Sequence, residues 1–130
     1  MDRVFLDANV LFSAAYREGA GLLALWTQPG VRLLTSGYAA EEARRNLDTV
    51  ERRERLEKLL ATVRIESEAP AAPLPSGVRL PEKDEPILRA AIAAGATCLL
   101  TGDLRDFGHL MGRRVAGVLV QTPGEFLRGG

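Results

Sequence analysis

The chain has 130 residues, the length of one domain, which is enough to bury a core without disulfides or other staples. Hydrophobic residues make up 46% and charged residues 26% of the sequence, as in ordinary soluble globular proteins. Lysine and arginine together number 17, and so do aspartate and glutamate, so the formal net charge is zero. The overall charge therefore cannot attract a nucleic acid, and any such binding requires a local basic surface. We expect a single domain over residues 1–130.

The cysteine content and the N-terminus indicate where the protein resides. Cys98 is the only cysteine, so no internal disulfide can form, as is typical of a reducing cytosol. It lies in an apolar run, where a cysteine usually acts as a small buried hydrophobe. Met1 is followed by Asp2 and Arg3 and then by a short apolar run, which is neither a secretory signal nor a membrane span. We expect a cytoplasmic protein without a membrane partner.

The first half of the chain alternates strand-like and helix-like segments. In chain order we predict a strand over 3–6, a helix over 22–28, a strand over 31–35, helices over 36–47 and 48–61, and a strand over 62–65. Residues 9–12 continue the apolar run that begins with the first strand. Pro29 and Gly30 end one helix, and Ser36 begins the next, because its hydroxyl can accept from the amides of the first turn.

The second half continues the alternation after a proline-rich loop that contains Pro70, Pro73, Pro75 and Pro81. A helix is predicted from Asp84 through Ala94, with Pro86 in its first turn and Gly95 at its end. We predict strands over 97–100 and 114–120, and a short final helix that Thr122 caps. Strands that alternate with helices indicate an α/β domain with a mainly parallel sheet of about five strands.

Two aspartates stand at the carboxyl ends of apolar strands. Asp7 comes after Val4-Phe5-Leu6, and Asp103 comes after the strand that ends at Leu100. In open α/β sheets the carboxyl ends of the strands collect ligands and chemistry, where the strand order reverses. Two carboxylates brought together there would repel each other unless a cation bound between them. A turn role is the alternative for Asp103, because Gly-Asp is common turn chemistry.

Glu42 and Asp84 are the other two candidates for this acidic site. Oxygen ligands of this kind suit hard cations such as Mg²⁺ or Mn²⁺. Glu41 competes with Glu42, but it precedes Arg45 by four residues, as in an exposed helix pair, whereas Glu42 flanks the apolar face of its helix. For Asp84 a helix cap is an equally good interpretation.

Three further polar residues stand close to these acids in the sequence. Asn9 and Thr101 each lie two residues from a strand-end aspartate, where they could hold the carboxylate or serve as ordinary strand-end residues. Asp106 is either a fifth acid or a turn former, and its sequence context favours the turn. No serine, histidine or cysteine has the setting of an activated nucleophile, and His109 has no partner that we can name.

The chain resembles the PIN domain, a compact nuclease fold, and more narrowly the small bacterial VapC-like PIN proteins of toxin–antitoxin systems. The matching stretches run from Val4 to Leu11, from Ser36 to Leu47, from Asp84 to Ala91 and from Leu100 to Asp103. The resemblance implies a three-layer α/β/α sandwich and an acidic site of Asp7, Glu42, Asp84 and Asp103, with Asn9 and Thr101 as lesser members. At Asp84 the match leaves Glu85 as an alternative.

The resemblance also implies an activity and partners. These are metal-dependent cleavage of RNA with Mg²⁺ or Mn²⁺, a small antitoxin chain, a homodimer and a cytoplasmic location. Three alternatives stay open: a PIN-like module that binds RNA or protein without cutting, a phosphotransfer receiver or small phosphatase, and a DNA-directed nuclease. Neither Lys58 nor Lys83 occupies the place of a receiver's partner lysine, and so short a chain lacks the extra helices that hold duplex ends.

Overall fold

The computed structural model describes residues 1–67 and 72–129. Within these residues a six-stranded sheet has the order β3-β2-β1-β4-β6-β5. Its strands are β1 (Asp2–Leu6), β2 (Val31–Ser36), β3 (Arg64–Glu66), β4 (Cys98–Leu100), β5 (Arg114–Val115) and β6 (Val118–Gln121). The strands run parallel except β5, which pairs with β6 in the antiparallel sense. The predicted α/β fold with a mainly parallel sheet is confirmed.

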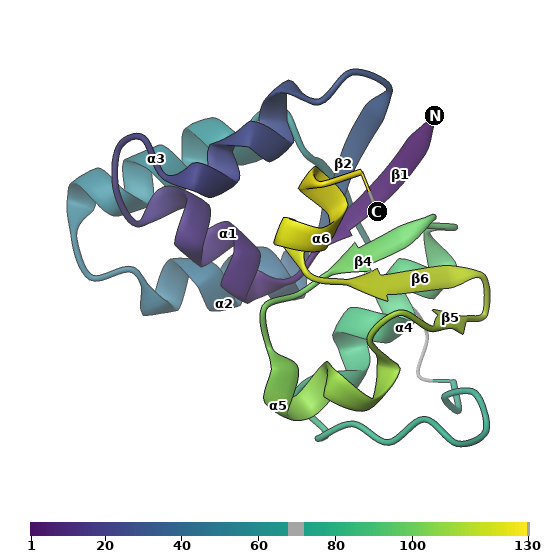
Figure 1. Ribbon diagram of the computed structural model, residues 1–130. Coiled ribbons are helices and arrows are strands. Elements are labelled where there is room, and N and C mark those ends of the chain that lie inside the picture. Colours follow the sequence, from purple (N-terminus) through teal and green to yellow (C-terminus); the bar gives the residue numbers. More distant parts are fainter. Residues whose placement is uncertain (68–71, 130) are drawn as a thin grey trace.

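Helices cover both faces of this sheet. They are α1 (Ala8–Ala15), α2 (Gly37–Asn46), α3 (Val50–Leu60), α4 (Glu85–Ala93), α5 (Leu104–Phe107) and α6 (Pro123–Leu127), with 3₁₀ segments η1 (Gly21–Thr27) and η2 (Gly108–Leu110). Figure 1 shows α1, α2 and α3 gathered on one side and α4 and α5 on the other. Of the described helices, none combines the length and the apolarity that crossing a bilayer requires.

Side chains from the sheet form two apolar cores, one on each face. Successive residues of a strand point to opposite faces, so Val4 and Leu6 pack into one core and Phe5 into the other. The first core also contains Leu56 of α3, and the second contains Ile87 of α4. Because both faces are buried, β1 is apolar throughout its second half. The two cores make this a three-layer α/β/α fold, as expected.

The strand order reverses at β1. From β1 the chain builds outward to β2 and β3, and it then returns to place β4 on the opposite side of β1. Leu6 lies level with Leu100 across this pair, and the amide of Asp7 donates to the carbonyl oxygen of Leu100 at 3.1 Å. The residues that follow β1 and β4 therefore leave the sheet side by side, at the edge where ligands bind in such folds.

Side-chain caps fix the helix starts that the sequence indicates. The hydroxyl of Ser36 accepts from the amide of Ala39 at 3.1 Å and begins α2. Thr122 and Glu125 form a reciprocal capping box at the start of α6. Each such cap stabilises the fold by about 1 kcal/mol. The predicted starts of these two helices are confirmed.

Residues 9–12 form part of a helix that was not predicted. They belong to α1, which begins directly after Asp7 and buries Val10, Leu11, Ala14 and Ala15. Val10 and Leu11 are followed four residues later by Ala14 and Ala15, and this spacing places all four side chains on one face of a helix. In the sequence this run stands out only as apolar, which on its own predicts neither a helix nor a strand.

The predicted strand over 114–120 is wrong, because this segment is a β-hairpin. Ala116 and Gly117 join β5 to β6 with φ angles of +50° and +87°. Positive φ at both central residues gives the turn the twist of a tight hairpin. Alanine rarely adopts this conformation, so the sequence lacks the usual signal.

The proline-rich segment before α4 is a loop in the part that the structure describes. Pro73, Pro75 and Pro81 lie in neither a helix nor a strand. Pro70 lies outside the described residues. The loop leads to the start of α4 and so sets where Asp84 enters the site.

Candidate metal centre

A cavity of about 340 Å³ lies at the carboxyl ends of β1 and β4. Its walls come from the start of α1, from α2, from the turn before α4 and from the loop after β4. The lining residues are Asp7, Asn9, Ser13, Glu42, Lys83, Asp84, Gly102 and Asp103. The structure therefore brings all four acids of the predicted site to one cavity, at the reversal point of the sheet.

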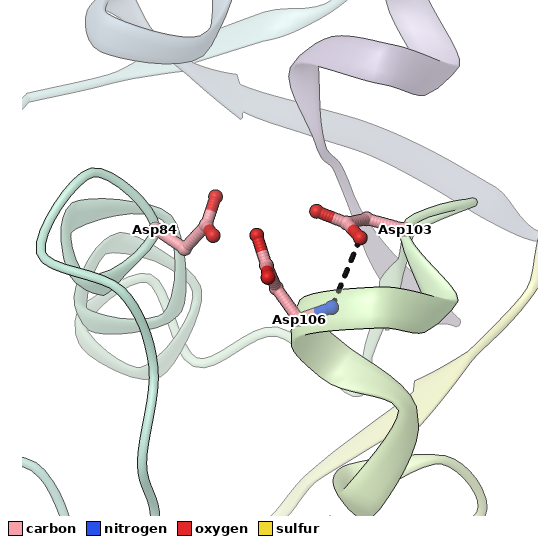
Figure 2. Close-up of side chains that lie close together, drawn as sticks. All are labelled: Asp84, Asp103 and Asp106. Carbon is pink, nitrogen blue, oxygen red and sulfur yellow. Dashed lines mark hydrogen bonds between the residues drawn. The ribbon is translucent and has the colours of Figure 1, made fainter.

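Three carboxyl groups form a tight cluster in this region. Asp84, Asp103 and Asp106 each offer an oxygen atom that lies within 4.8 Å of the other two (Figure 2). Asp103 also accepts a hydrogen bond of 3.0 Å from the amide of Asp106, which begins α5. Asp106 thus takes part in a local turn, as its sequence context favours, and also directs its carboxyl group into the cluster.

Asp84 is the most constrained member of the cluster. The residue is only 8% exposed, and its Oδ2 is buried and accepts no hydrogen bond from the N–H and O–H groups of residues 1–67 and 72–129. Burial, followed by the neighbouring carboxyl group of Asp106, raises the pKa of Asp84 to about 7. An unsatisfied buried oxygen destabilises a fold by about 1–3 kcal/mol unless something binds it.

The helix-cap interpretation of Asp84 is wrong. Although Asp84 occupies the position before α4, its side chain makes no capping hydrogen bond. Its backbone is helical there, so the side chain is free to turn away from the first helical amides. The neighbouring Glu85 binds Arg89 at 2.7 Å and does not line the cavity. Of these two acids, Asp84 is the one that faces the cavity.

Asp7 is buried and held from several directions. Its Oδ1 accepts from the amide of Ala8 at 2.7 Å, and its Oδ2 accepts from Thr101 Oγ1 at 2.8 Å and from Asn9 Nδ2 at 3.0 Å. Burial raises the pKa of Asp7, and the hydrogen bonds from Thr101 and Ala8 oppose that rise. The charges of Glu42 and Asp103 raise it further. Asp7 lines the cavity but is not a member of the three-carboxylate cluster.

Asn9 and Thr101 connect the two strand ends. Besides Asp7, the Asn9 side chain contacts the loop after β4, because its Oδ1 accepts from the amide of Gly102 at 2.8 Å. Thr101 Oγ1 accepts from the amide of Asp103 at 3.1 Å. The network holds Asp7 and the loop that carries Asp103 in fixed relative positions.

Glu41 and Glu42 point in different directions from α2. Glu42 lines the cavity and acts on Asp7 through its charge. The Glu41 side chain is 58% exposed and contacts Arg44 at 3.4 Å. Both arrangements follow from the buried helix face of Ala39 and Ala43, which turns one glutamate toward the sheet edge and the other toward solvent.

Three side chains of the cavity region were not predicted from the sequence, namely Ser13, Tyr38 and Lys83. Lys83 lines the cavity, and its Nζ lies 3.6 Å from Oδ2 of Asp106. The hydroxyl of Tyr38 donates to the Lys83 carbonyl oxygen at 2.6 Å and so joins α2 to the turn before α4. Lys83 directly precedes Asp84, and Tyr38 stands one helical turn before Glu42. These positions were the only features of the sequence that could have indicated that Lys83 and Tyr38 lie near the cavity.

Of the residues set aside as nucleophiles, His109 and Cys98 lie away from the cavity, whereas Ser13 lines it. His109 is exposed on η2, and Cys98 is buried in β4. Burial raises the pKa of the Cys98 thiol to about 12, so the thiolate that a nucleophile requires is suppressed at neutral pH. The ionisable side chains that line the cavity are those of Asp7, Glu42, Asp84, Asp103 and Lys83.

Comparisons with known proteins agree with this arrangement. The family model of the PIN domain matches residues 3–105. Among solved structures, VapBC2 from Rickettsia felis, bound to a DNA fragment from their promoter, is similar with a TM-score of 0.67 at 15% identity, over 92% of this chain and 98% of that one. VapBC-1 from nontypeable Haemophilus influenzae is similar with a TM-score of 0.60 at 17% identity, over 94% and 98%. No curated protein sequence matches. At these identities the solved structures show a shared fold.

Proposed function

The chain belongs to the PIN domain family, and on that basis we propose that it is a metal-dependent ribonuclease, acting as a single domain over residues 1–130, that hydrolyses RNA phosphodiester bonds. One observation carries the proposal. Among the described residues, the buried Oδ2 of Asp84 accepts no hydrogen bond from an N–H or O–H group, and the carboxyl groups of Asp103 and Asp106 lie close to it. A cation bound among the three would satisfy this oxygen and relieve the repulsion between the carboxylates.

The donor set fits a hard divalent ion. All candidate ligands are carboxylate oxygens, which Mg²⁺ and Mn²⁺ prefer, and the cavity of about 340 Å³ has room for waters that such an ion retains. In our proposal Asp84 and Asp103 hold the ion, together with Asp106 or Asp7, directly or through water. When bound, a divalent ion supplies positive charge to the phosphodiester and makes neighbouring water more acidic.

The remaining residues orient the acids and the reacting water. Asn9 and Thr101 keep the Asp7 carboxylate in one orientation, which preorganises the negative edge of the cavity. Glu42 stands on the opposite wall, on α2, where it accepts a proton from the attacking water or contributes to a second ion. The water oxygen forms a new bond to phosphorus, and one ester bond of the RNA breaks as its oxygen leaves with the bonding electrons.

We further propose a small antitoxin partner, a homodimer and a cytoplasmic location. The partner is supported by the fold likeness to two VapBC complexes. The homodimer follows from the resemblance alone. The cytoplasmic location follows from the resemblance and from the single cysteine.

The test is cleavage of a mixed set of labelled RNAs by the pure protein with Mn²⁺, with Mg²⁺ or with EDTA. The Asp7→Asn variant is assayed beside the wild type. We expect cleavage that requires the metal and is lost in the variant. Absence of cleavage under every condition would instead favour a PIN-like module that binds RNA or protein without cutting it.

A further inference from the structure

Lys83 brings a positive charge to the mouth of the acidic cavity. It is the cationic side chain among the lining residues, and its Nζ lies 3.6 Å from Oδ2 of Asp106. The Lys83 side chain is 64% exposed, so most of its length is in solvent. Its backbone is fixed, because the Tyr38 hydroxyl donates to its carbonyl oxygen at 2.6 Å. A fixed main chain therefore carries a flexible ammonium group beside the acids.

The charges of the cavity act on this ammonium group. Asp84, Asp103 and Glu42 line the same cavity, and Asp106 is the salt-bridge partner of the ammonium group. The positively charged group therefore lies in the same negative field that would attract a metal ion. It does not complete the site, because Oδ2 of the nine-tenths buried Asp84 still lacks a hydrogen-bond donor in the part of the chain that the structure describes.

We propose that Lys83 is a tethered cation that competes with a divalent metal ion for the acidic cavity, so that metal binding displaces its ammonium group toward solvent. This inference rests on the metal-binding part of the proposed function. In the metal-free protein Lys83 offsets part of the repulsion between Asp84, Asp103 and Asp106. A lysine suits this exchange because its charge is compact and its stem has many rotatable bonds.

The exchange raises the metal concentration that the site requires. An incoming ion must break the contact between Lys83 and Asp106 and then tolerate a positive charge nearby. The contact is weak because the lysine is largely exposed, so the penalty is modest. We expect removal of the charge to tighten metal binding by about three- to tenfold at low ionic strength, with a smaller effect at high salt.

The test measures Mn²⁺ binding without RNA, by titration calorimetry or by electron paramagnetic resonance of the free ion. It compares wild type with Lys83→Gln, and with Lys83→Arg, which keeps the charge. The matched control is Lys58→Gln, because Lys58 is the other lysine of the chain and lies exposed on α3, away from the cavity. We expect tighter binding in Lys83→Gln alone, with the other two variants within twofold of wild type.

Two outcomes would overturn the inference, and a third would separate it from the proposed ribonuclease activity. Equal or weaker Mn²⁺ binding in Lys83→Gln would show that the ammonium group does not compete with the ion. Failure of wild type and all variants to bind Mn²⁺ would remove both the exchange and the metal centre. Tighter binding in Lys83→Gln, combined with no RNA cleavage by any protein, would leave this inference standing and contradict the proposed ribonuclease activity.

Discussion

The hydroxyl of Thr101 donates a hydrogen bond of 2.8 Å to Oδ2 of Asp7, and this bond joins the carboxyl ends of β1 and β4. The two residues are 94 positions apart in the sequence, but the strands that they follow are neighbours in the sheet. Both residues are almost fully buried. The contact therefore holds the carboxyl group of Asp7, the first acid of the cavity, in a fixed position between two paired strands of the sheet.

Replacement of Thr101 by valine keeps the shape of the side chain and removes this donor. We expect Thr101→Val to lower the free energy of unfolding by about 1–3 kcal/mol, because a buried carboxylate loses a partner. RNA cleavage should fall by about 10- to 100-fold as Asp7 loses its orientation. Urea denaturation and initial cleavage rates measure the two effects.

The control for this substitution is Thr62→Val, which removes an exposed hydroxyl after α3. It should change stability by less than about 0.5 kcal/mol. Equal effects of the two substitutions would mean that the bond to Asp7 has no special role.

Asp84 makes the metal-free protein sensitive to pH. Its pKa is about 7 in the folded state and about 3.9 in an unfolded chain, so folding favours its protonated form. Its stabilising contribution is therefore complete below about pH 4 and is lost as the pH rises toward 7 and above. The raised pKa of Asp7 acts in the same direction, whereas the lowered pKa of Asp106 opposes it.

We accordingly expect Asp84→Asn to stabilise the metal-free protein at pH 8 by about 1–2 kcal/mol, with little change at pH 5. Calorimetric melting in EDTA at the two pH values measures this difference. Glu85→Gln is the control, because Glu85 pairs with Arg89 on the surface of α4. If the stability of wild type and of Asp84→Asn depended on pH in the same way, the raised pKa of Asp84 would be contradicted.

Glu41 and Glu42 provide a test from neighbouring positions. We expect Glu42→Gln to lower kcat/KM for RNA by about 100-fold or more, because a positioned carboxylate that accepts a proton is lost. Glu41→Gln should stay within about twofold of wild type, since this side chain is 58% exposed and pairs with Arg44. Losses of similar size in both variants would argue against the role given to Glu42.

Much of the acid arrangement follows from the sequence because it depends on local rules. An apolar run that ends in Asp7 or Asp103 predicts a buried strand with its carboxylate at one edge, and the parallel sheet brings the two edges together. The choice of Glu42 over Glu41 depends on the buried helix face, which the periodicity of alanines shows. These features require no knowledge of distant contacts.

Other features depend on the tertiary structure and could not be read from the sequence. Asp84 has the residue type and position of a helix cap, and only the packing of α4 against the cavity turns its carboxyl group toward Asp106. Lys83 stands in a charged segment that resembles an ordinary surface. The hairpin turn at Ala116 has no sequence signal, because alanine seldom adopts positive φ.

The measurement that tests the proposed function most directly is the single-turnover rate of RNA cleavage as a function of Mn²⁺ concentration, for wild type, Asp84→Asn and Glu85→Gln. We expect a saturable metal requirement in wild type, an unchanged requirement in Glu85→Gln, and a rate at least about 100-fold lower in Asp84→Asn. A wild-type rate that is unaffected by EDTA, or full activity in Asp84→Asn, would contradict the assignment of this cavity as a metal-dependent nuclease centre.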